Sequence, residues 1–239
     1  MLISINNPKQ HCRWHPYRST TELEQAALQA ILDAARQAIA QRGAFYIVLA
    51  GGTSPRRVYE LLRHASADWS AWHVYIGDER CLPPDHAERN SRMATEAWLD
   101  HVSIPPTQIH FIPAEKGPEA AARAYAERLA GLELFDLVLL GLGEDGHTAS
   151  LFPGHDPGMA LGAPDAIAVH DSPKPPPQRV SLSARRLSAA RQVMFLVTGA
   201  GKKQAVHDWR SGVGIPAAVI APRGGVDVYL EESLLSQAK

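Results

Sequence analysis

The chain has 239 residues, and its 24 Lys and Arg against 25 Asp and Glu give a formal net charge of −1. Because such a chain has no long-range positive field, nucleic acid and anionic membrane surfaces are not expected partners. Its longest apolar runs, such as FYIVLA at 45–50, are far shorter than the roughly 18 residues of a membrane span, and the N-terminus lacks a secretory signal pattern, so we expect a cytoplasmic protein.

The first half of the chain alternates helical and strand-like segments. A capping box at 21–24 opens a helix that is expected to run to about Arg42. Apolar runs typical of strands follow at 45–50, 72–77, 109–113 and 135–140. Between these runs, helices are predicted at 56–65, about 91–99 and 119–132. The polar stretch 78–91 is expected to form a loop.

The second half begins with residues 152–178, which are rich in Pro and Gly and contain one expected strand, at 166–170. Strand patterns resume at 179–183, 192–198 and 217–221, and a helix is predicted at 202–210. Strands that alternate with helices are typical of βαβ units, so we expect an α/β fold with a mainly parallel sheet and helices on both faces. Because no linker-like segment interrupts the chain, residues 1–239 are expected to form a single domain.

The segment 141–154, GLGEDGHTASLFPG, follows an apolar strand and is the most informative stretch of the sequence. Its glycines, Gly143 and Gly146 among them, expose backbone amides to a substrate, while Asp145 and His147 supply a carboxylate and an imidazole. A loop of this kind at the end of a parallel strand is typical of a small-molecule active site in an α/β protein.

The same segment also matches the dinucleotide fingerprint Gly-x-Gly-x-x-Gly, with Asp165 about twenty residues further on. That interpretation is disfavoured because Pro153 and Gly154 leave too little room for the long helix that the fingerprint requires. Asp165 also precedes a predicted strand, whereas the fingerprint acid should end one. Metal binding by Asp145 and His147 is possible but short of ligands. We therefore expect neither a dinucleotide nor a metal.

A second strand end carries Gly51, Gly52, Thr53 and Ser54. The glycines let an anion approach the backbone, and the helix that follows points its free amides and the positive end of its dipole at the same place. The two hydroxyl groups add donors. This segment is therefore predicted to bind phosphate, although an ordinary helix start capped by Ser54 would give the same pattern.

Charged residues mark two further positions. Asp78 and Arg80 lie just past a strand, where a guanidinium suits an oxyanion or a phosphate, but a solvated turn is the alternative. Arg179 begins a strand, and Lys202 stands where another strand ends in Gly-x-Gly and a helix begins. A lysine at a helix N-terminus opposes the dipole, which favours a bound anion there. A merely solvated lysine, or Lys203 facing the anion instead, are the alternatives.

Taken together, these residues resemble the 6-phosphogluconolactonases. The likeness lies in GDER, RNSRMATEAWL, GLGEDGHTASLFPG, QRVSLS and VTGAGKKQAV, which follow one another between about Leu49 and Ala205. It implies a Rossmann-like three-layer α/β sandwich and hydrolysis of 6-phospho-D-glucono-1,5-lactone in the oxidative pentose phosphate pathway. The implied partner is this sugar-phosphate lactone, with no cofactor and no metal. The oligomeric state stays open, with a monomer as one option.

The resemblance also implies a role for each site residue. His147 would be the general base, and Arg80 the cation that stabilises the oxyanion or orients the substrate. Asp78 and Asp145 would be their polar supports, and Gly143 and Gly146 would belong to the substrate loop. The phosphate site would consist of Gly51, Gly52, Thr53, Ser54, Arg179 and Lys202.

The wider superfamily includes the glucosamine-6-phosphate deaminases, which are the main alternative. Those enzymes are expected to have Glu, as the partner of the imidazole, where this chain has Phe152, and Tyr where it has Arg80. Both differences favour the lactonase, because a cation suits the stabilisation of a carbonyl oxyanion. A non-catalytic sugar-phosphate sensor is the third hypothesis, which the presence of both His147 and Arg80 disfavours.

Overall fold

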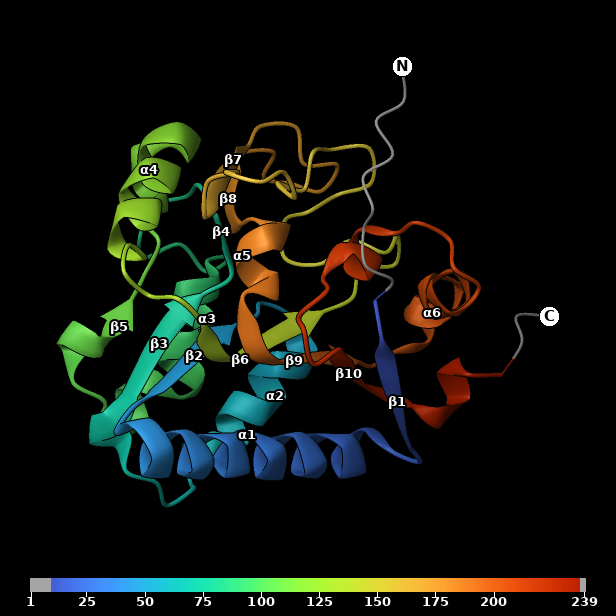
Figure 1. The fold of residues 1–239 in the computed structure, drawn as a ribbon, viewed down its shortest axis with the longest axis horizontal. Helices are drawn as coiled ribbons and strands as arrows, with labels where there is room; N and C mark the ends of the chain where they lie inside the picture. Colours follow the sequence, from blue (N-terminus) through green and yellow to red (C-terminus); the bar gives the residue numbers. More distant parts are fainter. Residues whose placement is uncertain (1–9, 237–239) are drawn as a thin grey trace.

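The computed structural model describes residues 10–236, in which seven parallel strands form one sheet and three antiparallel strands form a second (Figure 1). The order across the large sheet is β1 (Cys12–Tyr17), β10 (Val226–Glu231), β9 (Ala190–Val197), β6 (Phe135–Gly141), β2 (Phe45–Leu49), β3 (Trp72–Ile76) and β5 (Ile109–His110). The small sheet contains β4 (Asp78–Arg80), β8 (Arg179–Leu182) and β7 (Ala166–Val169).

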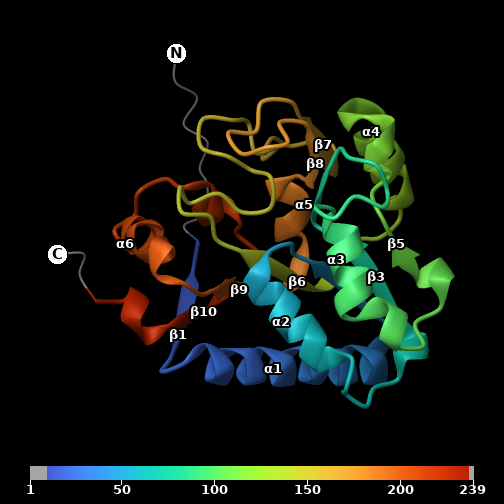
Figure 2. The ribbon, with the colours of Figure 1, turned by 180° about the vertical axis from the view of Figure 1, so that it is seen from behind.

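Helices cover both faces of the large sheet, so the expected three-layer α/β architecture is confirmed. α1 (Thr20–Arg42) and α2 (Thr53–Leu62) lie on one face, and α5 (Ala184–Ser188) with the small sheet lies on the opposite side (Figures 1 and 2). The helices are α1 (Thr20–Arg42), α2 (Thr53–Leu62), α3 (Asn90–Ala97), α4 (Pro118–Arg128), α5 (Ala184–Ser188) and α6 (Lys203–Arg210). None of the helices within residues 10–236 is long and apolar enough to cross a bilayer. The single-domain expectation stays a prediction.

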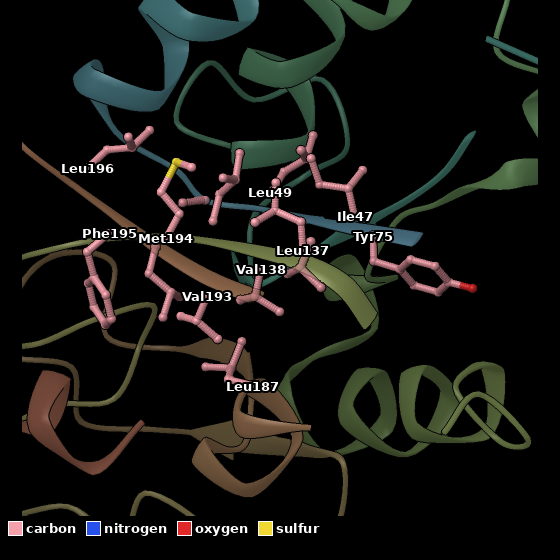
Figure 3. Close-up of a cluster of buried hydrophobic side chains, with 14 of the residues drawn as sticks. Ile47, Leu49, Tyr75, Leu137, Val138, Leu187, Val193, Met194, Phe195 and Leu196 are labelled. Carbon is pink, nitrogen blue, oxygen red and sulfur yellow. The ribbon is translucent and has the colours of Figure 1, made fainter. Parts of the chain in front are cut away.

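The central strands are buried on both faces, as parallel strands between two helical layers must be. The apolar runs of β2 and β6 are almost entirely inaccessible to solvent. Figure 3 shows Ile47 and Leu49 of β2 beside Leu137 and Val138 of β6, with Leu187 reaching this cluster from α5. This closely packed centre fixes the carboxyl ends of the strands relative to one another, and the loops that leave those ends inherit their positions.

The first and last strands of the chain, β1 and β10, both differ from the sequence expectation. The segment 217–221 was expected to be a strand, but Pro216–Val219 forms a 3₁₀ turn, because Pro216 has no amide hydrogen for a sheet ladder. The last strand is β10, in which Val226, Val228 and Leu230 are buried alternately. Strand β1 was not predicted at all. It lies at the edge of the sheet, where half-buried polar side chains and Pro16 are tolerated.

Three predicted boundaries are also wrong. Helix α1 is capped by Ser19, whose Oγ accepts from the Glu22 amide at 3.2 Å, so the cap lies two residues before Thr21. Helix α2 begins at Thr53 with Gly52 as its N-cap, so Ser54 is not the cap. The stretch that starts at Asp78 opens with strand β4 instead of a loop, because it pairs with β8.

Candidate active site

The carboxyl ends of β2, β3, β6 and β9 meet at one edge of the parallel sheet, and a cavity of about 330 Å³ opens there. The small antiparallel sheet supplies another wall. Lining residues come from all the predicted segments, among them Gly51, Asp78, Arg80, His147, Arg179 and Lys202. Residues that are far apart in the sequence therefore share one cleft, at the place where open α/β sheets bind ligands.

His147 is held in the cleft by Asp145. The imidazole Nδ1 is hydrogen-bonded to Asp145 Oδ1, and the Asp145 carboxylate also accepts from the His147 amide at 3.2 Å. Within residues 10–236, Nε2 has no hydrogen-bond partner, so it is the ring nitrogen left for a ligand. Burial lowers the pKa of His147 below its ordinary value, and Asp145 offsets part of this shift. A neutral imidazole with one open nitrogen can accept a proton at neutral pH.

Two glycines of this loop have different surroundings. Gly143 lines the cavity, and a Cβ atom there would lie 1.9 Å from His147 Nδ1, so only glycine lets the imidazole and Asp145 pack against this backbone. Gly146 does not line the cavity. It packs against Ile215 with a φ of 81°, and its carbonyl oxygen accepts from the Ala217 amide at 3.0 Å. Of the two glycines predicted for the substrate loop, only Gly143 therefore lies at the cavity.

Asp78 is buried beside the cavity and is fully engaged by hydrogen bonds. Ser150 Oγ donates to Asp78 Oδ2 at 2.6 Å, and Asn90 Nδ2 donates to the Asp78 carbonyl oxygen at 2.7 Å. A Cβ atom on Gly51 would overlap the Asn90 amide at 2.1 Å, so glycine is required for this close approach. The charge of Asp78 also opposes the lowering of the His147 pKa. Asp78 therefore holds Asn90 and Ser150 in place beside the cavity, and its charge acts on the imidazole of His147.

Arg80 and Arg179 lie directly opposite each other on neighbouring strands of the small sheet. They are direct partners in the antiparallel register of β4 and β8, and both line the cavity. Like charges opposite one another destabilise a strand pair, unless an anion lies between or beside them. Burial and the charge of Arg80 lower the pKa of Arg179, whereas Asp78 raises it. This pairing of two guanidinium groups is the strongest indication of an anion site.

The glycine segment at the start of α2 is only partly in the site. Gly51 and Gly52 line the cavity, and the N-terminus of α2 has no side-chain cap. The lining does not include Thr53 or Ser54. The hydroxyl of Ser54 is hydrogen-bonded to that of Thr198 instead. The backbone at this strand end is therefore available to an anion, whereas neither of the two predicted hydroxyl donors lines the cavity.

Lys202, and not Lys203, lines the cavity. This placement follows from the short 3₁₀ turn Ala200–Lys202, which precedes α6 and leaves Lys203 as the first residue of that helix. Burial lowers the pKa of the Lys202 ammonium group, Glu144 opposes that shift, and Lys174 adds to it. The amine is thus close to charges of both signs in the cleft.

Sequence reasoning missed several lining residues and one supporting residue, Glu79. Asn90 and Lys174 both line the cavity. Glu79 has no exposed surface, and its carboxylate accepts from the Asn90 and Ser91 amides at 2.8 Å each. No local pattern marks Glu79, because it precedes α3 by eleven residues in the sequence and reaches the first amides of that helix only through the fold. Lys174 lies in a proline-rich stretch that has no periodicity and gave no signal.

A metal site finds no support in the described part of the chain. No group of three or more His, Cys, Asp and Glu side chains within residues 10–236 is arranged to hold a metal ion. Asp145 and His147 are hydrogen-bonded to each other.

Comparison with known proteins places the chain among sugar-phosphate enzymes. The family model described as glucosamine-6-phosphate isomerases/6-phosphogluconolactonase matches residues 18–229. The chain is 40% identical over 223 residues to a 6-phosphogluconolactonase of Synechocystis sp., covering 88% of this chain and 91% of that protein.

Among solved structures, it is similar to the 6-phosphogluconolactonase of Trypanosoma brucei, with a TM-score of 0.82, 28% identity and coverage of 94% of this chain and 98% of the other. A monomeric glucosamine-6-phosphate deaminase superposes with a TM-score of 0.80 at 18% identity, covering 93% of this chain and 98% of the other. At that identity the likeness concerns the fold alone. The fold therefore does not separate the two activities.

Proposed function

The chain belongs to the glucosamine-6-phosphate isomerase/6-phosphogluconolactonase family, and we propose that it hydrolyses 6-phospho-D-glucono-1,5-lactone to 6-phospho-D-gluconate in the cleft at the strand ends. It is a lactone hydrolase of sugar-phosphate metabolism, acting in the pentose phosphate pathway. The observation that carries the assignment of the site is the His147–Asp145 pair, whose free Nε2 lies in the same cavity as the opposed Arg80 and Arg179.

In the proposed reaction, His147 acts twice. Its Nε2 takes a proton from a water molecule as the water oxygen attacks C1 of the lactone. The charge that develops on the carbonyl oxygen is met by Arg80, whose guanidinium is fixed by a hydrogen bond to the Glu88 carbonyl oxygen. When the bond between C1 and the ring oxygen breaks, the imidazolium returns the proton to that oxygen. Asp145 on Nδ1 holds the ring in one tautomer throughout.

The phosphate group at the other end of the substrate fixes C1 near His147. Gly51, Gly52 and the start of α2 offer backbone amides, and Arg179 and Lys202 offer charge. Binding energy gained at the phosphate orients the reacting carbon, so substrate without phosphate should react poorly. Thr53 and Ser54 are left out of this site because neither lines the cavity.

Replacement of Lys202 with Ala is expected to raise KM for the phosphorylated lactone about tenfold or more and to change kcat by less, because a charged contact to the phosphate is lost. Steady-state kinetics on both lysine variants test this. Lys203→Ala is the matched control, since that neighbour does not line the cavity and should keep the parent's KM. Equal effects at the two positions would contradict the assignment of Lys202.

A deaminase activity is disfavoured by Phe152. This buried side chain lies 4.8 Å from the His147 ring, centroid to centroid, and carries no carboxylate that could serve the imidazole in ring opening of an amino sugar. The test supplies freshly generated 6-phosphogluconolactone in one reaction and glucosamine 6-phosphate in another. We expect lactone loss well above the spontaneous rate and no ammonia. Ammonia release at enzymatic rates would establish a deaminase instead, and ligand binding without turnover would establish a sensor.

The chemistry requires only water and the side chains named, so we propose that no cofactor or metal takes part. A cytoplasmic location and a monomeric state also stay predictions. Localisation of a tagged chain and sedimentation of the purified protein would test them.

A further inference from the structure

The proline-rich segment 172–179, called here the proline turn, is built by two of its own side chains. Ser172 Oγ donates to the Lys174 carbonyl oxygen at 2.8 Å and accepts from the Lys174 amide at 3.3 Å. The Ser172 amide donates to the Pro177 carbonyl oxygen at 3.0 Å. These bonds close the turn and place Lys174 and Pro175 in the wall of the cavity.

Arg179 clamps the same turn from the side. Its Nε donates to the Pro176 carbonyl oxygen at 3.2 Å, and its Nη2 donates to the carbonyl oxygens of Lys174 and Pro175 at 3.0 and 3.1 Å. The residue is only 4% exposed, and its guanidinium lies 5.5 Å above the Phe152 ring. Of the three guanidinium nitrogens of Arg179, only Nη1 has no hydrogen-bond partner among residues 10–236. Two guanidinium nitrogens of Arg179 are thus hydrogen-bonded to the turn, and the third remains for a ligand.

Lys174 is a cation at the cavity whose ammonium group has no anionic partner within residues 10–236. Within the described chain, its ammonium group makes no hydrogen bond or ion pair, although the residue lines the cavity together with His147 and Lys202. Its charge lowers the pKa of both His147 and Lys202. Lys174 is therefore near both groups, and its repulsion with Lys202 would be relieved by an anion bound between them.

We propose that Lys174 is a further cation of the phosphate site, and that Arg179 acts on the substrate partly through the turn by fixing Lys174 over the cavity. The proposal rests on the proposed function for the identity of the phosphate ester, but it stands on the geometry of the turn for the anion itself. Lys174 then contributes to the preference for a phosphorylated lactone over the same lactone without phosphate.

The first test compares Lys174→Met with Lys203→Met. The second variant is the matched control, because it makes the same substitution at a lysine that does not line the cavity. For Lys174→Met we expect KM for 6-phosphogluconolactone to rise about tenfold to a hundredfold, the range for a lost hydrogen bond to a charged group. Turnover of glucono-1,5-lactone should change less than about twofold, and Lys174→Arg should recover most of the loss. An equal loss on both lactones would show that Lys174 only supports the fold of the turn.

A pH profile separates an electrostatic role from a structural one. The groups that act on His147 are Asp145 and Asp78, which raise its pKa, and Lys174, which together with burial lowers it. Removal of the Lys174 charge therefore raises the pKa of His147, and the acid limb of kcat/KM should move to higher pH in Lys174→Met. An unmoved limb would contradict the placement of the ammonium group beside the imidazole.

A binding measurement keeps the proposal testable apart from turnover. Inorganic phosphate is titrated calorimetrically into the parent, Lys174→Met, Arg179→Lys and the double variant. Each single change should weaken binding, and their effects should be less than additive because Arg179 acts in part through Lys174. Fully additive losses would overturn the coupling, and unchanged phosphate binding in Lys174→Met would overturn the site. Phosphate binding without lactone turnover in the parent would refute the proposed function alone.

Discussion

Replacement of His147 with Ala is expected to lower kcat about 100- to 10,000-fold with a small change in KM, because the variant loses the group that carries the proton in both steps. The lactone assay with freshly generated substrate measures this effect against the spontaneous rate. The expectation depends on a specific geometry, in which Asp145 holds Nδ1 and Nε2 is open to the cavity.

His155→Ala is the matched control for that change. His155 directly follows the same loop and also packs against Phe152, with 6.0 Å between ring centroids, but it does not line the cavity. We expect it to keep the parent's kcat. A folded His147→Ala protein whose kcat stays within threefold of the parent's would remove His147 from the mechanism.

Replacement of Glu79 with Ala is expected to lower the free energy of unfolding by about 3 to 5 kcal/mol, the usual effect of breaking a buried ion pair from one side. Glu79 is fully buried, and its Oε2 lies 3.2 Å from Arg89 Nε, on a residue that is only 3% exposed. The change leaves Arg89 with the partly exposed Glu115 as its remaining acidic partner. It also removes the acceptor for the first amides of α3.

Urea unfolding followed by circular dichroism tests this prediction. Glu96→Ala is the control on the same helix, because Glu96 forms an exposed pair with Arg92, and such pairs contribute less than about 1 kcal/mol. A loss below about 1 kcal/mol in Glu79→Ala would show that Arg89 finds equivalent partners without Glu79.

The strand-end chemistry could be predicted because glycine and polar residues follow apolar runs directly. The run at 135–140 ends at the loop of Asp145 and His147, and parallel pairing then brings that loop to the edge where Arg80 and Lys202 also lie. Periodicity and strand ends are local signals, and parallel topology turns them into proximity. That is why most of the residues proposed for catalysis and for the phosphate site could be predicted from the sequence to lie in one cleft.

The remaining features depend on contacts that no local pattern contains. Glu79 lies between two other charged residues and looked solvated, but the pairing of β4 with β8 and the start of α3 bury it. The guanidinium of Arg179 was expected to serve the phosphate alone, whereas most of its hydrogen bonds go to carbonyl oxygens of the proline turn. Strand β1 escaped prediction because an edge strand needs no continuous apolar run.

The central claim is that a neutral His147 in this cleft opens the lactone. The most direct test is the pH dependence of kcat/KM for freshly generated 6-phosphogluconolactone, corrected for spontaneous hydrolysis, in the parent and in His147→Ala. Because burial lowers the pKa of His147 below the ordinary value of about 6.5, the parent should lose activity through a single acid limb centred below about pH 6.5. The limb should be absent from the residual activity of His147→Ala. A parent profile without this limb, or the same limb in both proteins, would contradict the account.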